Sequence, residues 1–386
     1  MWLAKKLPVA MLCLLTCLLP VSCVNTDRGP ASIVSLQETD LDEPPQTTVW
    51  VKTLVRDLEE PWGMDFLPDG AILITEKGGE LKEVSPRGFN VRNVAGVPES
   101  VEAGQGGLLD VLVHPDFSSN GFVYLSYVVE ENKLYSTRII RARLENHRLV
   151  DHEVLITAQP FFAERRHFGS RLLIDNGFLY ITIGDRGNRD LAQSLETHNG
   201  KVLRLRDDGT VPGDNPFVGR EGARPEIWTY GHRNPQGIAT HPHTGAIWVS
   251  EHGPQGGDEI NALVRGANYG WPVISYGEEY GGGKIGIGTH HPDMEQPLTY
   301  YVPSIGTAGI DFYVGDTYPN WKASLLIAGL RRPQINKVEL AGDGLGGKSR
   351  MLANLEMRIR DVQVGPDGLI YALADGSRLI RFQLDR

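Results

Sequence analysis

The sequence predicts an all-β fold, a six-bladed β-propeller with four-stranded antiparallel blades. Three observations lead to this prediction. A strand–turn–strand unit recurs six times, several copies continue into a further pair of strands, and no segment has the pattern of a long helix. The composition agrees, because 45 glycines and 24 prolines suit many short strands joined by tight turns.

The clearest unit spans Met64–Glu76, where the turn Pro68-Asp69-Gly70 joins two apolar strands. The same pattern recurs at residues 361–373, near the C-terminus. Four looser copies lie between them and begin at Asp110, Leu172, Gly237 and Gly309. A solenoid would space its repeats more evenly, and a β-sandwich would not repeat one turn six times.

Further strands are expected after the units, at residues 80–84, 136–144, 201–205, 334–340 and 377–384. Each unit then holds about four strands, which is the content of one propeller blade. The strand expected at 48–58 precedes the first unit and can complete the last blade, closing the ring. The propeller domain is therefore assigned to residues 48–386.

The N-terminus has the features of an export signal over residues 1–23. Lys5 and Lys6 precede the apolar stretch Leu7–Leu19, which is too short to span a bilayer comfortably. Simple cleavage and lipoprotein-type cleavage both stay open. The second would leave Cys23 lipidated, although Pro20 stands where such sites usually carry leucine. The expected location is the periplasm, either free or anchored to the outer membrane on its periplasmic side.

The three cysteines, Cys13, Cys17 and Cys23, all precede the mature domain, which therefore has neither a disulfide nor a metal-binding thiolate. Residues 24–47 lack periodicity and are rich in Asp, Glu, Pro, Ser and Thr, as in a flexible tether. The net charge of −10 argues against nucleic acid as a partner. Monomer and dimer both stay open.

The chemically unusual residues lie in the loops between strands, where functional side chains are often displayed. Gln105 is surrounded by glycines, and His167 precedes a strand. His167 suits a general base because histidine titrates near neutral pH, but it also suits a turn cap. Arg331, Arg358 and Arg360 suit either a pocket for a polycarboxylate or phosphate, or a set of surface salt bridges.

Residues 230–237 bring Arg233 and Asn234 in front of a strand, and the segment 250–261 places carboxylates beside glycine-rich backbone. Side-chain and carbonyl oxygens of this kind suit calcium, which is a hard cation.

These motifs together resemble the glucose/sorbosone dehydrogenase family, the soluble quinoproteins that use pyrroloquinoline quinone (PQQ), and especially its aldose sugar dehydrogenase branch. The resemblance runs from about Glu60 to the C-terminus. It is carried by five segments in order: residues 104–110, 167–172, 230–237, 251–261 with 268–272, and 358–361.

The resemblance implies a role for individual residues. His167 matches the family's catalytic base. The residues matching those that hold the quinone are Gln105, Arg233, Asn234, Tyr280, Arg331, Arg358 and Arg360. Gly253 and Pro254 match backbone carbonyls that bind the active-site calcium, and Glu259 and Tyr269 match a second calcium site of the branch.

The implied function is oxidation of aldose sugars at the anomeric carbon to lactones, dependent on PQQ and calcium. Hydride passes to the quinone, which an unidentified electron acceptor then reoxidises. Arg166 stands where the glucose-specific branch has an aspartate, which favours the broader aldose branch. Arg331 replaces a lysine that is common in the family, and arginine is bulkier and planar.

Two other functions remain in competition. A calcium-dependent propeller lactonase or other hydrolase would need carboxylates and asparagines around a central metal, but would not need Arg233, Arg331, Arg358 and Arg360. A noncatalytic carbohydrate-binding propeller would have lost the cofactor. The presence of His167 together with the arginines argues against this second alternative.

Overall fold

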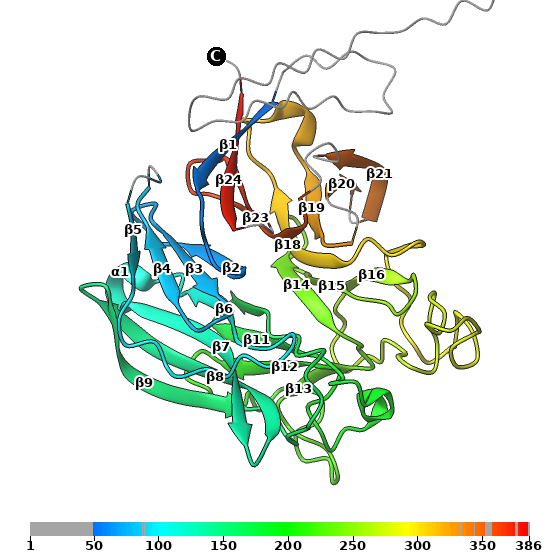
Figure 1. Ribbon diagram of the computed structural model, residues 1–386. Coiled ribbons are helices and arrows are strands. Elements are labelled where there is room, and N and C mark those ends of the chain that lie inside the picture. Colours follow the sequence, from blue (N-terminus) through cyan, green and yellow to red (C-terminus); the bar gives the residue numbers. More distant parts are fainter. Residues whose placement is uncertain are drawn as a thin grey trace, which may run out of the picture.

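The structure, a computed structural model, describes residues 49–384 apart from 87, 89, 332–333, 343, 352–356 and 375–376. The expected signal segment, the tether and Cys23 lie outside the described residues. The predicted architecture is confirmed, because the strands form six separate four-stranded antiparallel sheets. Figure 1 shows these sheets arranged around a common centre.

Each of the first three sheets holds four strands that are consecutive in the chain. They comprise β2 (Pro61–Phe66), β3 (Ile72–Glu76), β4 (Leu81–Val84) and β5 (Val91–Asn93), then β6 (Leu108–Val113), β7 (Phe122–Glu131), β8 (Leu134–Glu145) and β9 (Arg148–Thr157), then β10 (Leu172–Asp175), β11 (Phe178–Ile183), β12 (Lys201–Arg206) and β13 (Ile227–Tyr230).

The fourth and fifth sheets follow the same order, and the sixth takes its outer strand from the N-terminus. They comprise β14 (Pro235–Thr240), β15 (Ile247–Glu251), β16 (Asp258–Ala262) and β17 (Thr299–Tyr301), then β18 (Thr307–Tyr313), β19 (Ser324–Gly329), β20 (Gln334–Ala341) and β21 (Gly344–Met351), then β22 (Ile359–Val364), β23 (Ile370–Ala374), β24 (Arg378–Leu384) and β1 (Val49–Val55).

The ring closes as the sequence predicts. Strand β1 pairs antiparallel with β24, with Val49 opposite Leu384 and Thr53 opposite Ile380. The first strand of each blade contacts the first strand of the next, so β2, β6, β10, β14, β18 and β22 form the inner ring. All six predicted strand–turn–strand units coincide with the two innermost strands of a blade.

The core is divided among the interfaces between blades. Leu73 of β3 and Leu125 of β7 belong to the cluster between the first two blades, and every other pair of neighbouring blades encloses a similar cluster. Both faces of a blade are therefore buried, which explains the nearly continuous apolar strands in the sequence.

Aspartates of the inner strands link neighbouring blades. Asp65 of β2 accepts a hydrogen bond from the backbone N–H of Val113 on β6, at 2.6 Å. Asp110 accepts one from Leu172 at 2.8 Å, and Asp311 of β18 one from Val364 of β22, also at 2.8 Å. These bonds satisfy backbone donors that no blade can pair within its own sheet.

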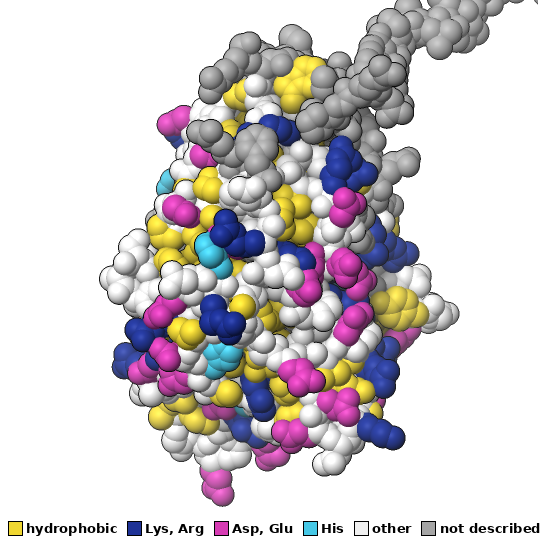
Figure 2. All heavy atoms as spheres, turned by 60° about the vertical axis from the view of Figure 1, so that its left-hand side comes forward, with side chains coloured by type: hydrophobic (Ala, Val, Ile, Leu, Met, Phe, Trp, Pro, Cys, Tyr) yellow, Lys and Arg dark blue, Asp and Glu magenta, His cyan; other side chains and the backbone are white. Residues whose placement is uncertain are grey.

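Helical structure is limited among the described residues to α1 (Phe117–Asn120) and two short 3₁₀ turns, Arg189–Gln193 and Pro319–Trp321. No helix in the described ranges is long and apolar enough to cross a membrane. On the face shown in Figure 2, basic and acidic side chains are interspersed.

Candidate active site

A cavity of about 590 Å³ opens at the end of the ring where the innermost strands begin. Its lining comes from the start of every blade, since it includes Trp62, Leu109, Gly169, Asn234, Gly306 and Arg358. Loops far apart in the sequence therefore meet here, as the closed ring predicts. The volume suits a ligand of the size of a small cofactor.

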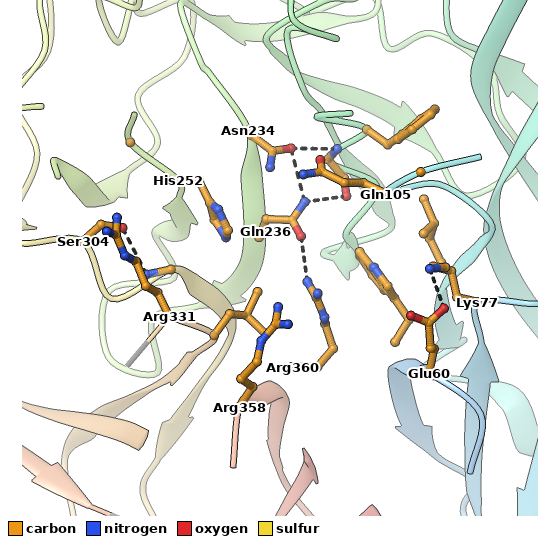
Figure 3. Close-up of a pocket in the computed structure, with 18 of the residues that line it drawn as sticks. Glu60, Lys77, Gln105, Asn234, Gln236, His252, Ser304, Arg331, Arg358 and Arg360 are labelled. Atoms are coloured by element: carbon orange, nitrogen blue, oxygen red, sulfur yellow. Dashed lines mark hydrogen bonds and ion pairs between the residues drawn. The ribbon is translucent and has the colours of Figure 1, made fainter. Parts of the chain in front are cut away.

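One wall of the cavity is strongly basic. Arg331, Arg358 and Arg360 all line it, and Figure 3 shows them on the same side. Arg358 lies one residue before β22 and Arg360 lies within it. The Nη1 atom of Arg360 donates to Oε1 of Gln236 at 3.3 Å. These three guanidinium groups suit an anionic ligand with several carboxylates.

Asn234 and Gln236 place amide groups beside the basic wall, and both residues are buried. The Oδ1 atom of Asn234 accepts hydrogen bonds from the backbone N–H of Gly169 at 3.2 Å and from Nε2 of Gln236 at 3.3 Å (Figure 3). Gln236 is the second amide of the segment 230–237, but no role was assigned to it from the sequence. Its position two residues after Asn234 on a strand, where side chains alternate, was the available signal.

His167 is not among the residues that line the cavity, but it lies next to two that do, Gln105 and Phe168. Its backbone N–H donates to Oε1 of Gln105 at 2.8 Å. The residue has a positive φ of 54°, a conformation that non-glycine residues adopt uncommonly, often at functional sites. The loop therefore holds His167 and Gln105 in a fixed relationship.

Asp185, which sequence reasoning missed, orients the imidazole of His167. Its Oδ1 atom lies 2.7 Å from Nδ1 of His167, and its Oδ2 atom accepts a hydrogen bond from the indole of Trp271 at 2.8 Å. Burial alone would raise the pKa of Asp185. The hydrogen bonds from His167 and from the backbone of Gly187 outweigh burial, so that this pKa lies below its ordinary value.

The ionised carboxylate of Asp185 can only accept a hydrogen bond, so the imidazole nitrogen that faces it, Nδ1, carries the proton. The lone pair of the imidazole is therefore on Nε2. Burial lowers the pKa of His167 below its ordinary value. The hydrogen bond to Asp185 opposes this shift, and the positive charge of Arg233 adds to it. His167 is therefore neutral at pH 7 and able to accept a proton at Nε2.

Arg233 is buried beside the cavity rather than in its lining. Its Nη1 atom donates to the carbonyl of His252 at 3.1 Å, and its Nη2 atom lies 3.4 Å from the hydroxyl of Tyr280. The Nε atom is buried without a hydrogen-bond partner in the described structure. Tyr280 lines the cavity but is 70% exposed, so Arg233 is the better fixed of the two.

Gly253 and Pro254 lie where the main cavity meets a smaller one of about 10 Å³. A Cβ atom on Gly253 would approach the carbonyl oxygen of Gly257 to 2.2 Å, so this turn requires glycine.

The turn is held by Asp258, to which the sequence analysis assigned no role. Its buried carboxylate accepts from the backbone N–H of Gly253 at 3.0 Å and also bonds Ser304, Ile305, Gly306 and Thr307.

Glu259 and Tyr269 line the smaller cavity together with Glu251. Burial and the charge of Glu251 raise the pKa of Glu259 to about 8. Tyr269 donates its hydroxyl proton to the carbonyl of Ala262 at 2.6 Å, and the same hydroxyl accepts from the N–H of Val264 at 2.9 Å. The phenol is thus occupied within the protein, whereas the carboxylate of Glu259 has unused oxygen lone pairs.

The wall opposite Ser304 and Arg331 carries a second group that the sequence did not reveal (Figure 3). Lys77 and Glu60 line the cavity, and the Nζ atom of Lys77 lies 2.5 Å from Glu60 and 3.3 Å from Glu102. These side chains add charged and hydrogen-bonding groups to the otherwise aromatic surface of Trp62 and Phe168.

The chain is similar to known sugar dehydrogenases over most of its length. The sequence model of the Glucose / Sorbosone dehydrogenase family matches residues 58–381. The aldose sugar dehydrogenase YliI of Escherichia coli is 40% identical over 337 residues, which cover 86% of this chain and 91% of that protein.

Solved structures lead to the same group. The apo crystal structure of the soluble aldose sugar dehydrogenase of Escherichia coli matches with a TM-score of 0.85 and 39% identity, over 87% of this chain and 99% of that one. The PQQ-bound aldose sugar dehydrogenase of Streptomyces coelicolor matches with a TM-score of 0.72 and 25% identity, over 88% and 100% of the two chains.

Proposed function

The chain belongs to the glucose/sorbosone dehydrogenase family, and from this premise we propose that it oxidises aldose sugars at the anomeric carbon to lactones, with PQQ and calcium as cofactors. The observation that carries the proposal is the pairing of a proton acceptor with an anion-binding wall. His167, oriented by Asp185 at 2.7 Å, adjoins two residues of a cavity that three arginines line.

The residues present fit the quinone. PQQ carries three carboxylates, and Arg331, Arg358 and Arg360 offer guanidinium groups that suit them. Asn234 and Gln236 offer amides, and Arg233 retains an unpaired Nε–H beside the cavity. In this proposal the arginines hold the carboxylates and the amides orient the ring system.

The residues present also fit calcium. Gly253 and Pro254 provide carbonyl oxygens at the cavity, and none of the hydrogen bonds recorded among the described residues ends on these two oxygens. Glu259 and Glu251 add carboxylates in the smaller cavity, where a cation would relieve their mutual repulsion. When bound, the quinone supplies the hydride acceptor, and calcium supplies a Lewis acid beside it.

The chain's own part in the reaction is to bind, orient and deprotonate the sugar. The Nε2 atom of His167 takes the proton of the anomeric hydroxyl, while Asp185 stabilises the imidazolium that forms. Gln105, fixed against the backbone of His167 at 2.8 Å, presents its amide NH₂ to the sugar oxygens. The sugar becomes a lactone when its anomeric hydroxyl loses this proton and its anomeric carbon loses a hydride.

The hydrolase alternative has less support, because the described residues form no cluster of three or more His, Cys, Asp or Glu side chains that could hold a metal ion. Two carboxylates of innermost strands, Asp110 and Asp361, are each 3.0 Å from the guanidinium of Arg171 and are therefore engaged by a cation of the protein itself. The charges of Arg358 and Arg360 would serve no purpose in such a hydrolase.

Reconstitution tests the proposed function. The protein prepared without cofactor is mixed with PQQ, calcium, a dye acceptor and a panel of aldoses. Dye reduction is expected only when both PQQ and calcium are present. Absence of quinone binding together with absence of dye reduction by any aldose would refute the proposal.

We further propose that the protein is exported and works in the periplasm, with an electron acceptor reoxidising the quinone there. The basis is the segment 1–23, with its Lys5–Lys6 pair and apolar stretch. Fractionation of the native host, with mass analysis of the mature N-terminus, distinguishes a free protein from one lipidated at Cys23. Recovery of the intact chain from the cytoplasm would contradict export.

A further inference from the structure

Arg171 lines a separate cavity of about 40 Å³ between innermost strands, together with Asp110 and Asp361. It is 4% exposed and immediately precedes β10. Its contacts reach residues of β2, β6, β14 and β22, or positions next to these strands, and only a side chain near the common axis can touch so many blades. It does not line the main cavity itself.

We propose that Arg171 is a positioning residue that fixes the cavity wall for cofactor binding, by clamping the backbones of Trp62, Gln236 and Arg360 from three different blades. The inference rests on the proposed function, because the ligand for which Arg171 arranges the cavity wall is the quinone. In this role Arg171 links residues of several blades near the propeller axis, which a bound metal ion could also do.

The guanidinium uses all of its N–H groups in this clamp. Nε donates to the carbonyl of Gln236 at 2.8 Å, and Nη2 donates to the carbonyls of Arg360 at 3.2 Å and Trp62 at 3.4 Å. Nη1 donates to Asp110 and Asp361, at 3.0 Å each. The guanidinium also lies 4.3 Å from the centre of the Trp62 ring.

Trp62, Gln236 and Arg360 all line the cavity, and each comes from a different blade. Arg171 thus binds the backbone carbonyls of the same three residues that line the cavity. Arg360 in turn donates to the side chain of Gln236 at 3.3 Å. Fixing these backbones relative to one another therefore fixes the spacing of the basic wall and the amides.

The two carboxylates make this clamp specific to arginine. Asp110 also accepts from the N–H of Leu172, and Asp361 from the N–H of Met64 at 3.2 Å, so both are held by neighbouring blades. Removing the cation would leave two buried carboxylates unpaired, which is strongly destabilising. Lysine would keep the charge but could not reach two carboxylates and three carbonyls from one ammonium.

The test compares Arg171→Lys with Arg204→Lys. Arg204 is a matched control, because it is also buried, donates to Asp214 at 3.0 Å, and lies 3.6 Å from the ring of Phe178, but does not line the cavity. PQQ affinity is measured by tryptophan fluorescence with calcium present. Arg171→Lys is expected to weaken binding about tenfold or more, and Arg204→Lys less than about twofold.

A second measurement does not depend on the quinone. Amide hydrogen exchange of the cofactor-free protein is followed in peptides covering residues 60–66, 234–240 and 358–364. Arg171→Lys should speed exchange in all three peptides, whereas Arg204→Lys should leave them unchanged. Failure of the wild type to bind PQQ would count against the proposed function, while unchanged exchange in Arg171→Lys would overturn this inference.

If Arg171→Lys does not fold, Asp110→Asn replaces it, because this variant keeps Arg171 and removes one of its charged acceptors. It should accelerate exchange in the same peptides and weaken PQQ binding about threefold or more. Wild-type exchange and wild-type affinity in Asp110→Asn would overturn the inference.

Discussion

The imidazole of His167 and the carboxylate of Asp185 lie 2.7 Å apart, at the end of the hairpin β10–β11 where the chain enters β10 and leaves β11. The indole of Trp271 holds the second oxygen of Asp185 at 2.8 Å from yet another blade. Residues from two blades thus fix the tautomer of one histidine.

Replacing His167 by alanine should abolish most turnover while quinone binding survives. A positioned general base contributes about 10²- to 10⁴-fold, and a fall in kcat of this size is expected. Dye-reduction kinetics and fluorescence titration with PQQ measure the two quantities separately. His114→Ala, which changes a histidine directly after β6 that does not line the cavity, is the control. Full turnover in the His167 variant would show that another group is the base.

Asp185→Asn should lower kcat about 10²-fold with little change in PQQ affinity, because the amide can donate to Nδ1 and so favour the wrong tautomer. Circular dichroism and PQQ titration check that fold and cofactor site persist. Wild-type kcat in this variant would show that His167 does not depend on the tautomer fixed here.

The pH dependence of kcat/KM should report the pKa of His167. Burial lowers this pKa below the ordinary 6.5, so the base stays neutral and active through pH 7. Activity should therefore fall only as the pH drops below 6.5, with a slope of one proton. The pH–rate profile of the wild type measures this. An acidic limb with its midpoint above pH 7 would contradict the assignment.

Arg358→Ala and Arg360→Ala should each weaken PQQ binding. A hydrogen bond between charged groups contributes about 1.5–3 kcal/mol, which corresponds to about ten- to a hundredfold in Kd. The affinity of the wild type should also fall with added salt, and less steeply in each variant. Arg148→Ala, at an exposed position of β9, is the control. Wild-type Kd in both variants would remove the arginines from the quinone site.

Asp258→Ala should destabilise the fold and weaken calcium binding together. The carboxylate serves the backbone N–H groups of Gly253, Ile305, Gly306 and Thr307, and its loss leaves buried donors unpaired. A loss of about 3 kcal/mol or more in the free energy of unfolding is expected. Urea denaturation and calcium titration measure the two effects, and Asp316→Ala, an exposed position, should change neither. A stable variant with normal calcium affinity would disprove the role of Asp258.

The blades could be predicted because their signals are local. The turn Pro68-Asp69-Gly70 and its repeats are each contained within a few residues, and an apolar strand lies on either side of each turn. Arg358 and Arg360 line one cavity and His167 adjoins its lining, as a closed ring leads one to expect, since all three precede or begin an innermost strand.

Asp185 and Arg171 were harder to predict. Because β10 and β11 form a hairpin in which Leu172 pairs with Ile181, the residues before β10 and after β11 must be neighbours. That register could have linked His167 to Asp185. The role of Arg171 depends on carbonyls and carboxylates from four other blades, which no local pattern in the sequence reveals.

The pairing of β1 with β24 has a consequence for the order of events during biosynthesis. The sixth blade contains the first and the last of the described strands, and Arg358 and Arg360 belong to this blade. In a nascent polypeptide, the blade that carries these two arginines is therefore complete only after β24 has been synthesised and has paired with β1. On the proposed function, the quinone would bind its full site only after the sixth blade has closed.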